Sequence, residues 1–203
     1  MTSTTTHQPQ PHGVSGRASV ETALLDAAER LLVEVGHAGI TTRRLADSAG
    51  VNHGLVHYYF GSMENVLVRS LERFTDRLIN RQRALYAADE PFIEKWRTAM
   101  RHLTSDDLAY GKVWLELQAL AWNNDALRSR LAAVDAEWRE VLTEAFTAPH
   151  DDLAAHGVDM PLDAMVSLVM TFNLGIMLER QSGIDAGHRE LLAWIDQWLH
   201  VRG

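Results

Sequence analysis

Residues 41–67 contain two short helical segments separated by a tight turn, and this arrangement constrains the chain more than any other feature. The pattern predicts a helix over residues 43–49, a stop at Gly50 and a second helix over residues 54–60. Thr41 is expected to cap the first helix, because its side-chain oxygen can accept from free backbone N–H groups. Two helices joined this closely form a helix-turn-helix, whose second helix is the one offered to a DNA major groove.

The rest of the chain also has helical periodicity. Apolar spacing predicts flanking helices over residues 19–35, with Ser19 as N-cap, and 62–84. Beyond residue 88 we expect helices only, with Pro91 starting one, Asp125 capping a long one and a break at residues 148–149. The sequence therefore predicts an all-α fold of about nine helices. Residues 1–16 form a disordered tail, residues 17–63 a three-helix DNA-binding domain and residues 64–203 an all-helical second domain.

Charge is distributed unevenly along the chain, although the total of −8 argues against binding nucleic acid by bulk charge. Residues 1–83 hold nine basic and eight acidic side chains, whereas residues 84–203 hold ten and nineteen. Such a field is weak, so DNA affinity would need specific contacts and two copies of the motif.

Several classes of protein are disfavoured. The chain has no cysteine, so disulfides and cysteine-based zinc sites are excluded. We find no apolar run of the length that a membrane span needs and no signal-peptide pattern, and we expect a cytoplasmic protein. His53 and His57 have the i, i+4 spacing of metal ligands, but no glutamate lies between them, and we predict no metal and no cofactor. Without a phosphate-binding loop or a nucleophile elbow, an enzyme in an all-helical fold is the weakest alternative.

Candidate DNA contacts gather in the helix-turn-helix. Polar and aromatic side chains that suit phosphates and base edges stand beside threonine and arginine. Phe60 is expected in the core, with at most one of the two preceding tyrosines. The candidates are Thr42, Arg43, Arg44, Asn52, His53, Gly54, Leu55, His57, Tyr58 and Tyr59.

The motif and its setting resemble the TetR (tetracycline-repressor) family of bacterial transcription regulators. The resemblance rests on Gly36, the run Ile40-Thr41-Thr42-Arg43-Arg44-Leu45-Ala46, Ala49-Gly50-Val51, and Tyr59-Phe60-Gly61-Ser62 followed by Glu64-Asn65-Val66-Leu67. In the family, the positions matching Thr42, Arg43, Asn52, His53, Gly54, Leu55, His57 and Tyr59 contact DNA. Two positions depart from it: Met63 stands where a phosphate-binding lysine is frequent, and His57 stands where a tyrosine is usual.

Residues 162–181 form a predicted helix that is apolar nearly all round, so it needs cover on two sides. A second subunit supplies the second cover most simply, and Gly175 in mid-helix would permit a close approach. The resemblance likewise implies a homodimer through the last two helices, and hence a pseudo-palindromic DNA operator. The candidate interface residues are Met165, Leu168, Phe172, Ile176, Trp194 and Trp198.

Six tryptophans and seven methionines are many for 203 residues. At helical spacing such side chains usually pack a core, but the resemblance favours a small-molecule pocket whose polar groups are Gln118 and Asn173. The candidates are Trp96, Met100, Tyr110, Trp114, Gln118, Trp122, Phe172, Asn173 and Met177. The sequence thus predicts a ligand-responsive transcription regulator, most simply a repressor released from its operator by a small hydrophobic effector. A DNA-binding regulator without an effector is the main alternative.

Overall fold

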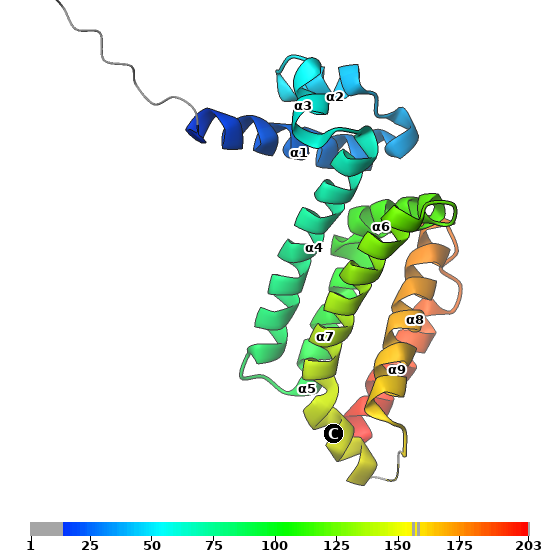
Figure 1. Cartoon of the computed structure of the whole chain (residues 1–203). Coiled ribbons are helices and arrows are strands. Elements are labelled where there is room, and N and C mark those ends of the chain that lie inside the picture. Colours follow the sequence, from blue (N-terminus) through cyan, green and yellow to red (C-terminus); the bar gives the residue numbers. More distant parts are fainter. Residues whose placement is uncertain (1–13, 156, 158, 203) are drawn as a thin grey trace, which may run out of the picture. The chain divides into compact units, whose positions relative to one another are not determined.

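The computed structural model describes residues 14–155, 157 and 159–202, and in that part of the chain every regular element is helical (Figure 1). The all-α prediction is therefore confirmed. The α-helices of the described residues are α1 (Val14–Val35), α2 (Thr42–Ala49), α3 (Gly54–Phe60), α4 (Met63–Ala87), α5 (Phe92–Arg101), α6 (Leu108–Ala121), α7 (Asp125–Ala155), α8 (Leu162–Gln181) and α9 (His188–Arg202). A 3-10 turn, η1 (His37–Gly39), and a π-helical turn, η2 (His102–Asp106), complete the series.

The chain forms two compact units, of which the first ends at Val66 and the second begins at Leu67. Helix α4 runs through this boundary, so its first turn belongs to the first unit and the rest of it to the second.

Helix α1 begins earlier than its apolar pattern suggested. It starts at Val14, and the Ser19 hydroxyl donates to the Gly16 carbonyl at 2.8 Å inside the helix, so the prediction that Ser19 is the N-cap is wrong. The expected disordered tail covered residues 1–16; residues 14–16 are helical, and residues 1–13 lie outside the described residues. The buried face of α1 is the predicted stripe, centred on Leu24, Ala28 and Leu32.

The turn chemistry of the first unit follows the sequence. The Thr41 side chain accepts from the Arg44 N–H at 3.1 Å, which confirms it as the cap of α2. Gly50 ends α2 in the left-handed conformation, with φ 68° and ψ 31°, which a residue with a Cβ adopts at a cost. Leu45 and Ala46 are buried, and α2 packs against α1.

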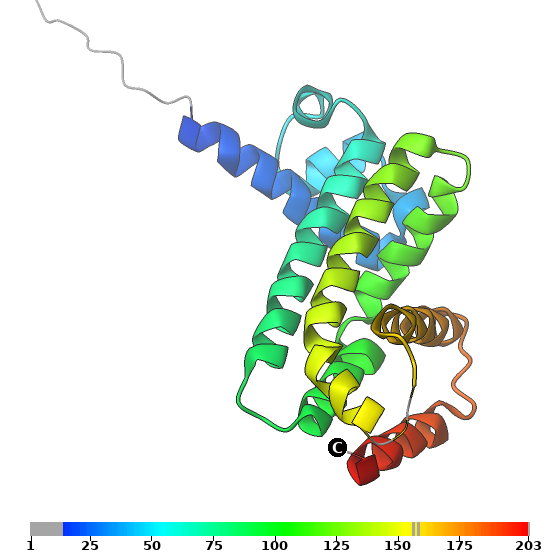
Figure 2. The ribbon, with the colours of Figure 1, turned by 60° about the horizontal axis from the view of Figure 1, so that its bottom comes forward.

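The second unit is a bundle in which α4 and α7 lie side by side (Figures 1 and 2). Two ion pairs join these helices, Glu72 with Arg130 at 2.7 Å and Arg83 with Glu140 at 3.4 Å. The apolar core contributes most of the stability, because these ion pairs are partly or well exposed. Its most deeply buried large side chains include Leu71, Val68, Leu117, Leu131 and Val141.

Two predicted details of α7 are wrong. Asn124 is the residue whose side chain caps the helix, accepting from the Leu127 N–H at 3.0 Å, and Asp125 is the first helical residue. Pro149 does not break the helix, which continues to Ala155. A proline removes only one backbone donor, and packing of Phe146 and Leu153 on either side of it keeps the last turns against the core.

Helix α8 has the bounds that its pattern predicts. Its composition corrects the expectation that no apolar run of the chain reaches the length that a membrane span needs. In the part of the chain that the structure describes, this helix is long and apolar enough to cross a membrane, with a mean hydropathy of 1.4 over its most apolar window. Only 17% of that window is buried within the protomer. Because α8 packs against α6 and α7, one of its sides is covered by its own unit and the other is left without cover.

Candidate functional site

Helix α3 divides its side chains between the core and the surface. Val56 and Phe60 are buried, as expected for Phe60, whereas His57 and Tyr58 are exposed, Tyr58 to 64%. Tyr59 is half-buried. The helix therefore presents one polar, aromatic face to solvent, and of its two tyrosines Tyr59 is the one that contacts the core.

The start of α3 depends on Asn52. Its side-chain oxygen accepts from the Gly54 N–H at 2.8 Å, while His53 makes no side-chain cap. A Cβ at position 54 would lie 3.3 Å from that oxygen, so glycine leaves room for the cap. Asn52 and Gly54 therefore position the helix, and His53 stays exposed at its end.

The side chains of Arg43 and Arg44 on α2 differ in how firmly their contacts hold them. The Arg44 guanidinium donates to the Gly39 carbonyl at 3.3 Å and is thereby held against η1. Arg43 has only an exposed contact of 3.9 Å with Asp47, which is too weak to fix it. Thr42 is half-buried beside it.

His57 and Arg17 add an imidazole ring and a guanidinium group to the same surface. His57 Nδ1 lies 3.2 Å from the Gly61 carbonyl, and because a carbonyl only accepts, Nδ1 carries a proton and Nε2 is the ring atom left to solvent. The Arg17 guanidinium lies 5.4 Å from the ring centre of Tyr58 and 5.9 Å from that of Tyr59. Sequence reasoning missed Arg17, because it precedes the predicted start of α1.

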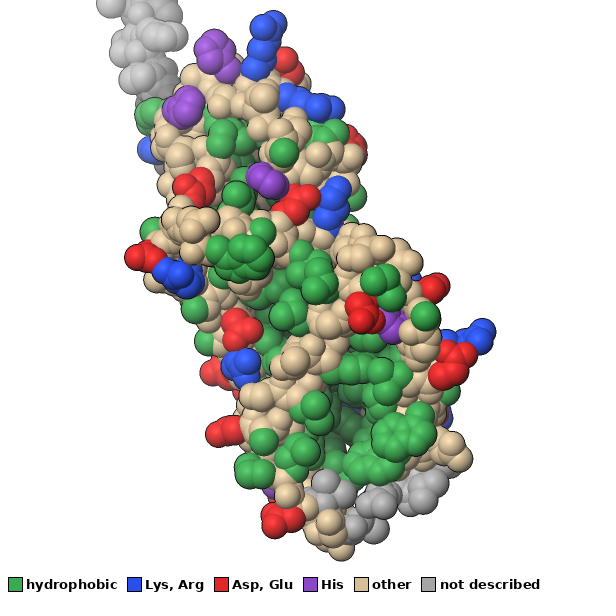
Figure 3. Space-filling model, turned by 90° about the vertical axis from the view of Figure 1, so that its right-hand side faces the viewer, with side chains coloured by type: hydrophobic (Ala, Val, Ile, Leu, Met, Phe, Trp, Pro, Cys, Tyr) green, Lys and Arg blue, Asp and Glu red, His purple; other side chains and the backbone are tan. Residues whose placement is uncertain are grey.

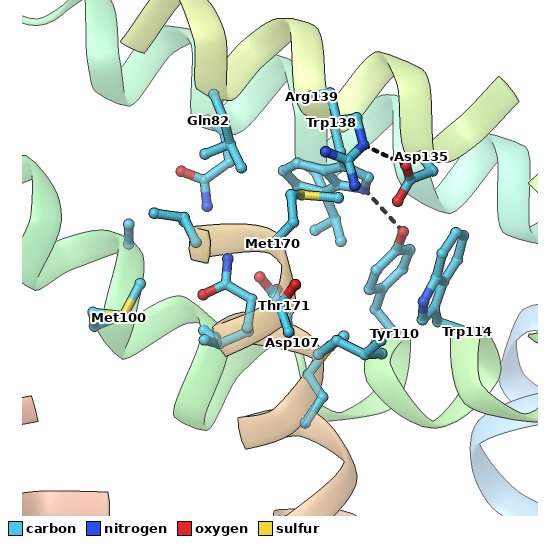
Figure 4. Close-up of a pocket in the computed structure, with 18 of the residues that line it drawn as sticks. Gln82, Met100, Asp107, Tyr110, Trp114, Asp135, Trp138, Arg139, Met170 and Thr171 are labelled. Atoms are coloured by element: carbon cyan, nitrogen blue, oxygen red, sulfur yellow. Dashed lines mark hydrogen bonds and ion pairs between the residues drawn. The ribbon is translucent and has the colours of Figure 1, made fainter. Parts of the chain in front are cut away.

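The second unit encloses a cavity of about 210 Å³ among α4, α5, α6, α7 and α8 (Figure 4). On one side of it, the Tyr110 hydroxyl accepts from Trp138 Nε1 at 3.0 Å and lies 3.3 Å from the Thr75 hydroxyl. The Tyr110 and Trp114 rings stack with centres 6.3 Å apart. Gln82 lies on the other side of the space in Figure 4.

The ionised groups in the cavity wall have opposite charges beside them. Asp107 pairs with Arg81, and Asp135 accepts from Arg139 Nε at 2.8 Å. Burial raises the pKa of Tyr86 and the pKa of Tyr110 to about 12, so both phenols are neutral at pH 7. Two buried amide oxygens, Gln82 Oε1 and Asn173 Oδ1, have no hydrogen-bond partner within the described protein.

Comparison of the chain with known protein families and sequences bears most directly on the first unit. The model of a family described as bacterial regulatory proteins, tetR family, matches residues 24–69. The HTH-type transcriptional repressor KstR2 of Rhodococcus jostii strain RHA1 is 34% identical over 80 residues. The helix-turn-helix region of the chain is therefore similar in sequence to the TetR family. The match to KstR2 covers 39% of this chain, and this chain spans 39% of the repressor's own length.

Two solved structures share this fold over nearly the whole chain. A transcriptional regulator from Saccharomonospora viridis in complex with choline is 18% identical, with a TM-score of 0.70 over 90% of this chain and 94% of that one. The regulator FadR of Bacillus subtilis in complex with stearoyl-CoA is 17% identical, with a TM-score of 0.68 over 88% and 96%.

Seven of the nine predicted ligand-binding residues line the cavity. They are Trp96, Met100, Tyr110, Trp114, Gln118, Asn173 and Met177. Trp122 does not: α6 ends at Ala121, and Trp122 is 76% exposed beyond it. Phe172 also lies outside the wall and packs on the neighbouring core, since it points about 100° away from Asn173 around α8.

Sequence reasoning missed the walls that α4 and α7 supply. Leu78, Gln82 and Tyr86 recur every four residues on α4, and α7 contributes Asp135, Trp138, Arg139 and Leu142. Gln82, a polar residue four positions from Leu78 on an apolar stripe, was the available signal on α4.

The residues predicted to form the dimer interface differ in their solvent exposure. Met165 and Ile176 are buried in their own protomer and therefore do not belong to its exposed surface. Leu168 and Trp194 are 58% and 61% exposed, and Phe172 and Trp198 are half-buried. Figure 3 shows hydrophobic side chains gathered on the side of the second unit where α8 and α9 lie. The exposed large apolar residues of these helices and the loop between them are Leu168, Leu174, Leu178, Ile184, Leu191 and Trp194.

Trp138→Phe tests the hydrogen bond that closes one side of the cavity. The change removes the donor to Tyr110 and leaves a gap beside it, so we expect the free energy of unfolding to fall by about 1–3 kcal/mol in urea denaturation. Trp122→Phe, at an exposed position, should change it by less than about 0.5 kcal/mol. Equal effects of the two substitutions would contradict the assignment.

Proposed function

We propose that this chain is a DNA-binding transcriptional regulator of the TetR family, and specifically a repressor that a small hydrophobic molecule releases from its operator. The observation that carries the proposal is the presence, in one chain, of a helix-turn-helix with an exposed polar face and of a largely apolar cavity whose wall includes α4. Residues 17–63 would serve as the DNA-binding domain, and residues 64–203 as the ligand-binding and dimerisation domain.

For DNA, α3 would enter the major groove with His57, Tyr58 and Tyr59 on its exposed side. Arg43 is the side chain of α2 with the most freedom to reach the duplex, and Arg17 adds a cation beside the tyrosines. Because the net charge of the first 83 residues is close to zero, two copies on two half-sites would be needed for tight binding.

A homodimer through α8 and α9 would supply the second copy. Exposed leucines on α8 and Trp194 on α9 form an apolar face that a second identical face would cover. Gly175 lies on α8 where a Cβ would meet no atom of the protomer, so nothing within one chain accounts for a mid-helix glycine. Contact with a partner helix does account for it, and the same cover explains the hydropathy of α8 without a membrane.

Helix α4 offers a direct route between ligand and DNA. It is one continuous helix whose first turn belongs to the unit with the helix-turn-helix, and whose residues Leu78, Gln82 and Tyr86 line the cavity. A ligand that favours one position of α4 would therefore favour one spacing of the two DNA-binding units in the dimer, as a shift between two populations.

The named relatives are transcriptional regulators, so we assign no catalytic role to the chain. Because the proposed activity is on DNA and the named relatives are bacterial, we propose that the protein works in the cytoplasm. The alternative of a regulator without an effector predicts that the cavity stays empty of any small molecule, and ligand binding measured on the purified protein separates the two.

Arg43→Ala tests the proposed DNA surface. Loss of a side chain that contacts a base or phosphate should weaken binding to a duplex, selected by the protein from a random pool, by about 1–3 kcal/mol in a fluorescence-anisotropy titration. Arg128→Ala is the control, because Arg128 is exposed on α7 in the second unit. If the two variants bind the duplex equally well, Arg43 is not part of the DNA contact.

Gly175→Leu tests the dimer. The protomer has room for the new side chain, so folding should be kept, whereas a partner helix packed close to this position would be pushed away. We expect sedimentation equilibrium to give a dimer at least about tenfold weaker, equivalent to 1.4 kcal/mol. Ala136→Leu on the exposed side of α7 is the matched control. Unchanged dimerisation of Gly175→Leu would remove this face of α8 from the interface.

A further inference from the structure

Two carboxamide groups in the cavity wall have unused hydrogen-bonding capacity. Gln82 is 9% exposed, and its Oε1 atom is buried without a partner, as is Asn173 Oδ1 on α8. Buried acceptors in native proteins are nearly always satisfied, by protein, by water or by a bound molecule. The two residues belong to different helices and line the same space, so a molecule that fills it can donate to both oxygens.

The charged side chains of the wall already have counter-ions. Asp107 has Arg81 as its counter-ion, and Asp135 has Arg139, which also donates to the Ser167 hydroxyl at 3.1 Å. A charged ligand would need to break one of these pairs or lie in an apolar site without a counter-ion, and both are unfavourable. The remaining wall is mainly aromatic and aliphatic, with Trp96, Trp114 and Trp138 as its largest members.

The size of the cavity limits the ligand as well. Its volume is about 210 Å³, and by the measure in which one water needs about 10–15 Å³, it holds roughly fifteen non-hydrogen atoms.

We propose that the effector is an uncharged, mainly apolar molecule of this size that donates two hydrogen bonds, through two hydroxyls or a primary amide, one to Gln82 and one to Asn173. The inference rests on the proposed ligand response and names its chemical class. That class differs from choline, which is a cation, and from stearoyl-CoA, which is an anion and far larger, although both are bound by structural relatives of this chain.

The test uses five probes that share a straight ten-carbon chain and differ in their head groups, on the wild-type protein at pH 7.5. These are 1-decanol, decanamide, 1-methoxydecane, decanoate and decylamine. Binding is followed by quenching of tryptophan fluorescence and by the shift in melting temperature. We expect decanol and decanamide to bind at least about tenfold tighter than decanoate and decylamine, and also tighter than 1-methoxydecane, which has no proton to donate.

Two substitutions assign the donor contact to the amides. Gln82→Met and Asn173→Leu keep the approximate shape and remove the acceptor. Each should weaken the binding of decanamide, whose two N–H groups can donate one bond to each residue, by about five- to tenfold and leave 1-methoxydecane unchanged. Asn80→Leu is the matched control, because Asn80 is an exposed amide on the same helix and does not line the cavity. The two variants lie on different helices, so if one of them fails to fold, the other still tests the prediction.

Tightest binding by decanoate or decylamine, equal binding of all probes, or no binding by any of them would overturn the inference. Release of the selected DNA duplex, measured on the same samples, tests the proposed function separately. Decanamide that binds selectively without releasing DNA supports the ligand class and contradicts ligand-controlled repression. A charged probe that binds tightest and releases DNA supports repression and contradicts the class.

Discussion

The second unit depends on the hydrogen bonds around one buried phenol. Tyr110 on α6 accepts from Trp138 on α7 and lies within hydrogen-bonding distance of Thr75 on α4, so three helices meet at one oxygen. Burial raises the pKa of Tyr110 to about 12, which keeps this oxygen neutral and the contact intact across the physiological range. These directional bonds join the three helices beside the cavity that Tyr110 and Trp138 line.

Helices α4 and α8 each lie in two different environments, and the proposed function follows from this. Helix α4 starts in the unit that carries the helix-turn-helix and ends in the cavity wall, so one continuous helix begins in the unit proposed to bind DNA and lines the proposed ligand site. Helix α8 contributes Asn173 and Met177 to the cavity while Leu168 and Leu178 remain exposed on its other side. A molecule in the cavity therefore touches the helix proposed to reach the DNA-binding unit and the helix proposed to form the dimer.

Local features were predictable from the sequence because they depend on neighbours within a few residues. The Thr41 cap, the left-handed Gly50 and the bounds of α8 all follow from such short-range rules. Features that depend on which helices become neighbours were not. Periodicity placed Met165 and Ile176 on an apolar face with Leu168, but only the packed fold shows that these two side chains are covered by the protomer itself while Leu168 is exposed. Trp122 was misplaced because the end of α6 was unknown, and Gln82 was missed because nothing local says that α4 faces α8 across a cavity.

The central claim is that occupation of the cavity and tight binding of DNA exclude one another. The most direct measurement is the DNA affinity, without any ligand, of Ala99→Phe, in which a covalently attached ring occupies part of the cavity beside Met100. Ala99→Leu occupies less of it, and Ala136→Phe on the surface of α7 controls for added bulk. The account predicts a folded dimer whose affinity for a selected duplex falls by about tenfold or more in Ala99→Phe and by less in Ala99→Leu, which is at least 1.4 kcal/mol for the larger side chain. A folded Ala99→Phe dimer that binds this duplex as tightly as the wild type would contradict it.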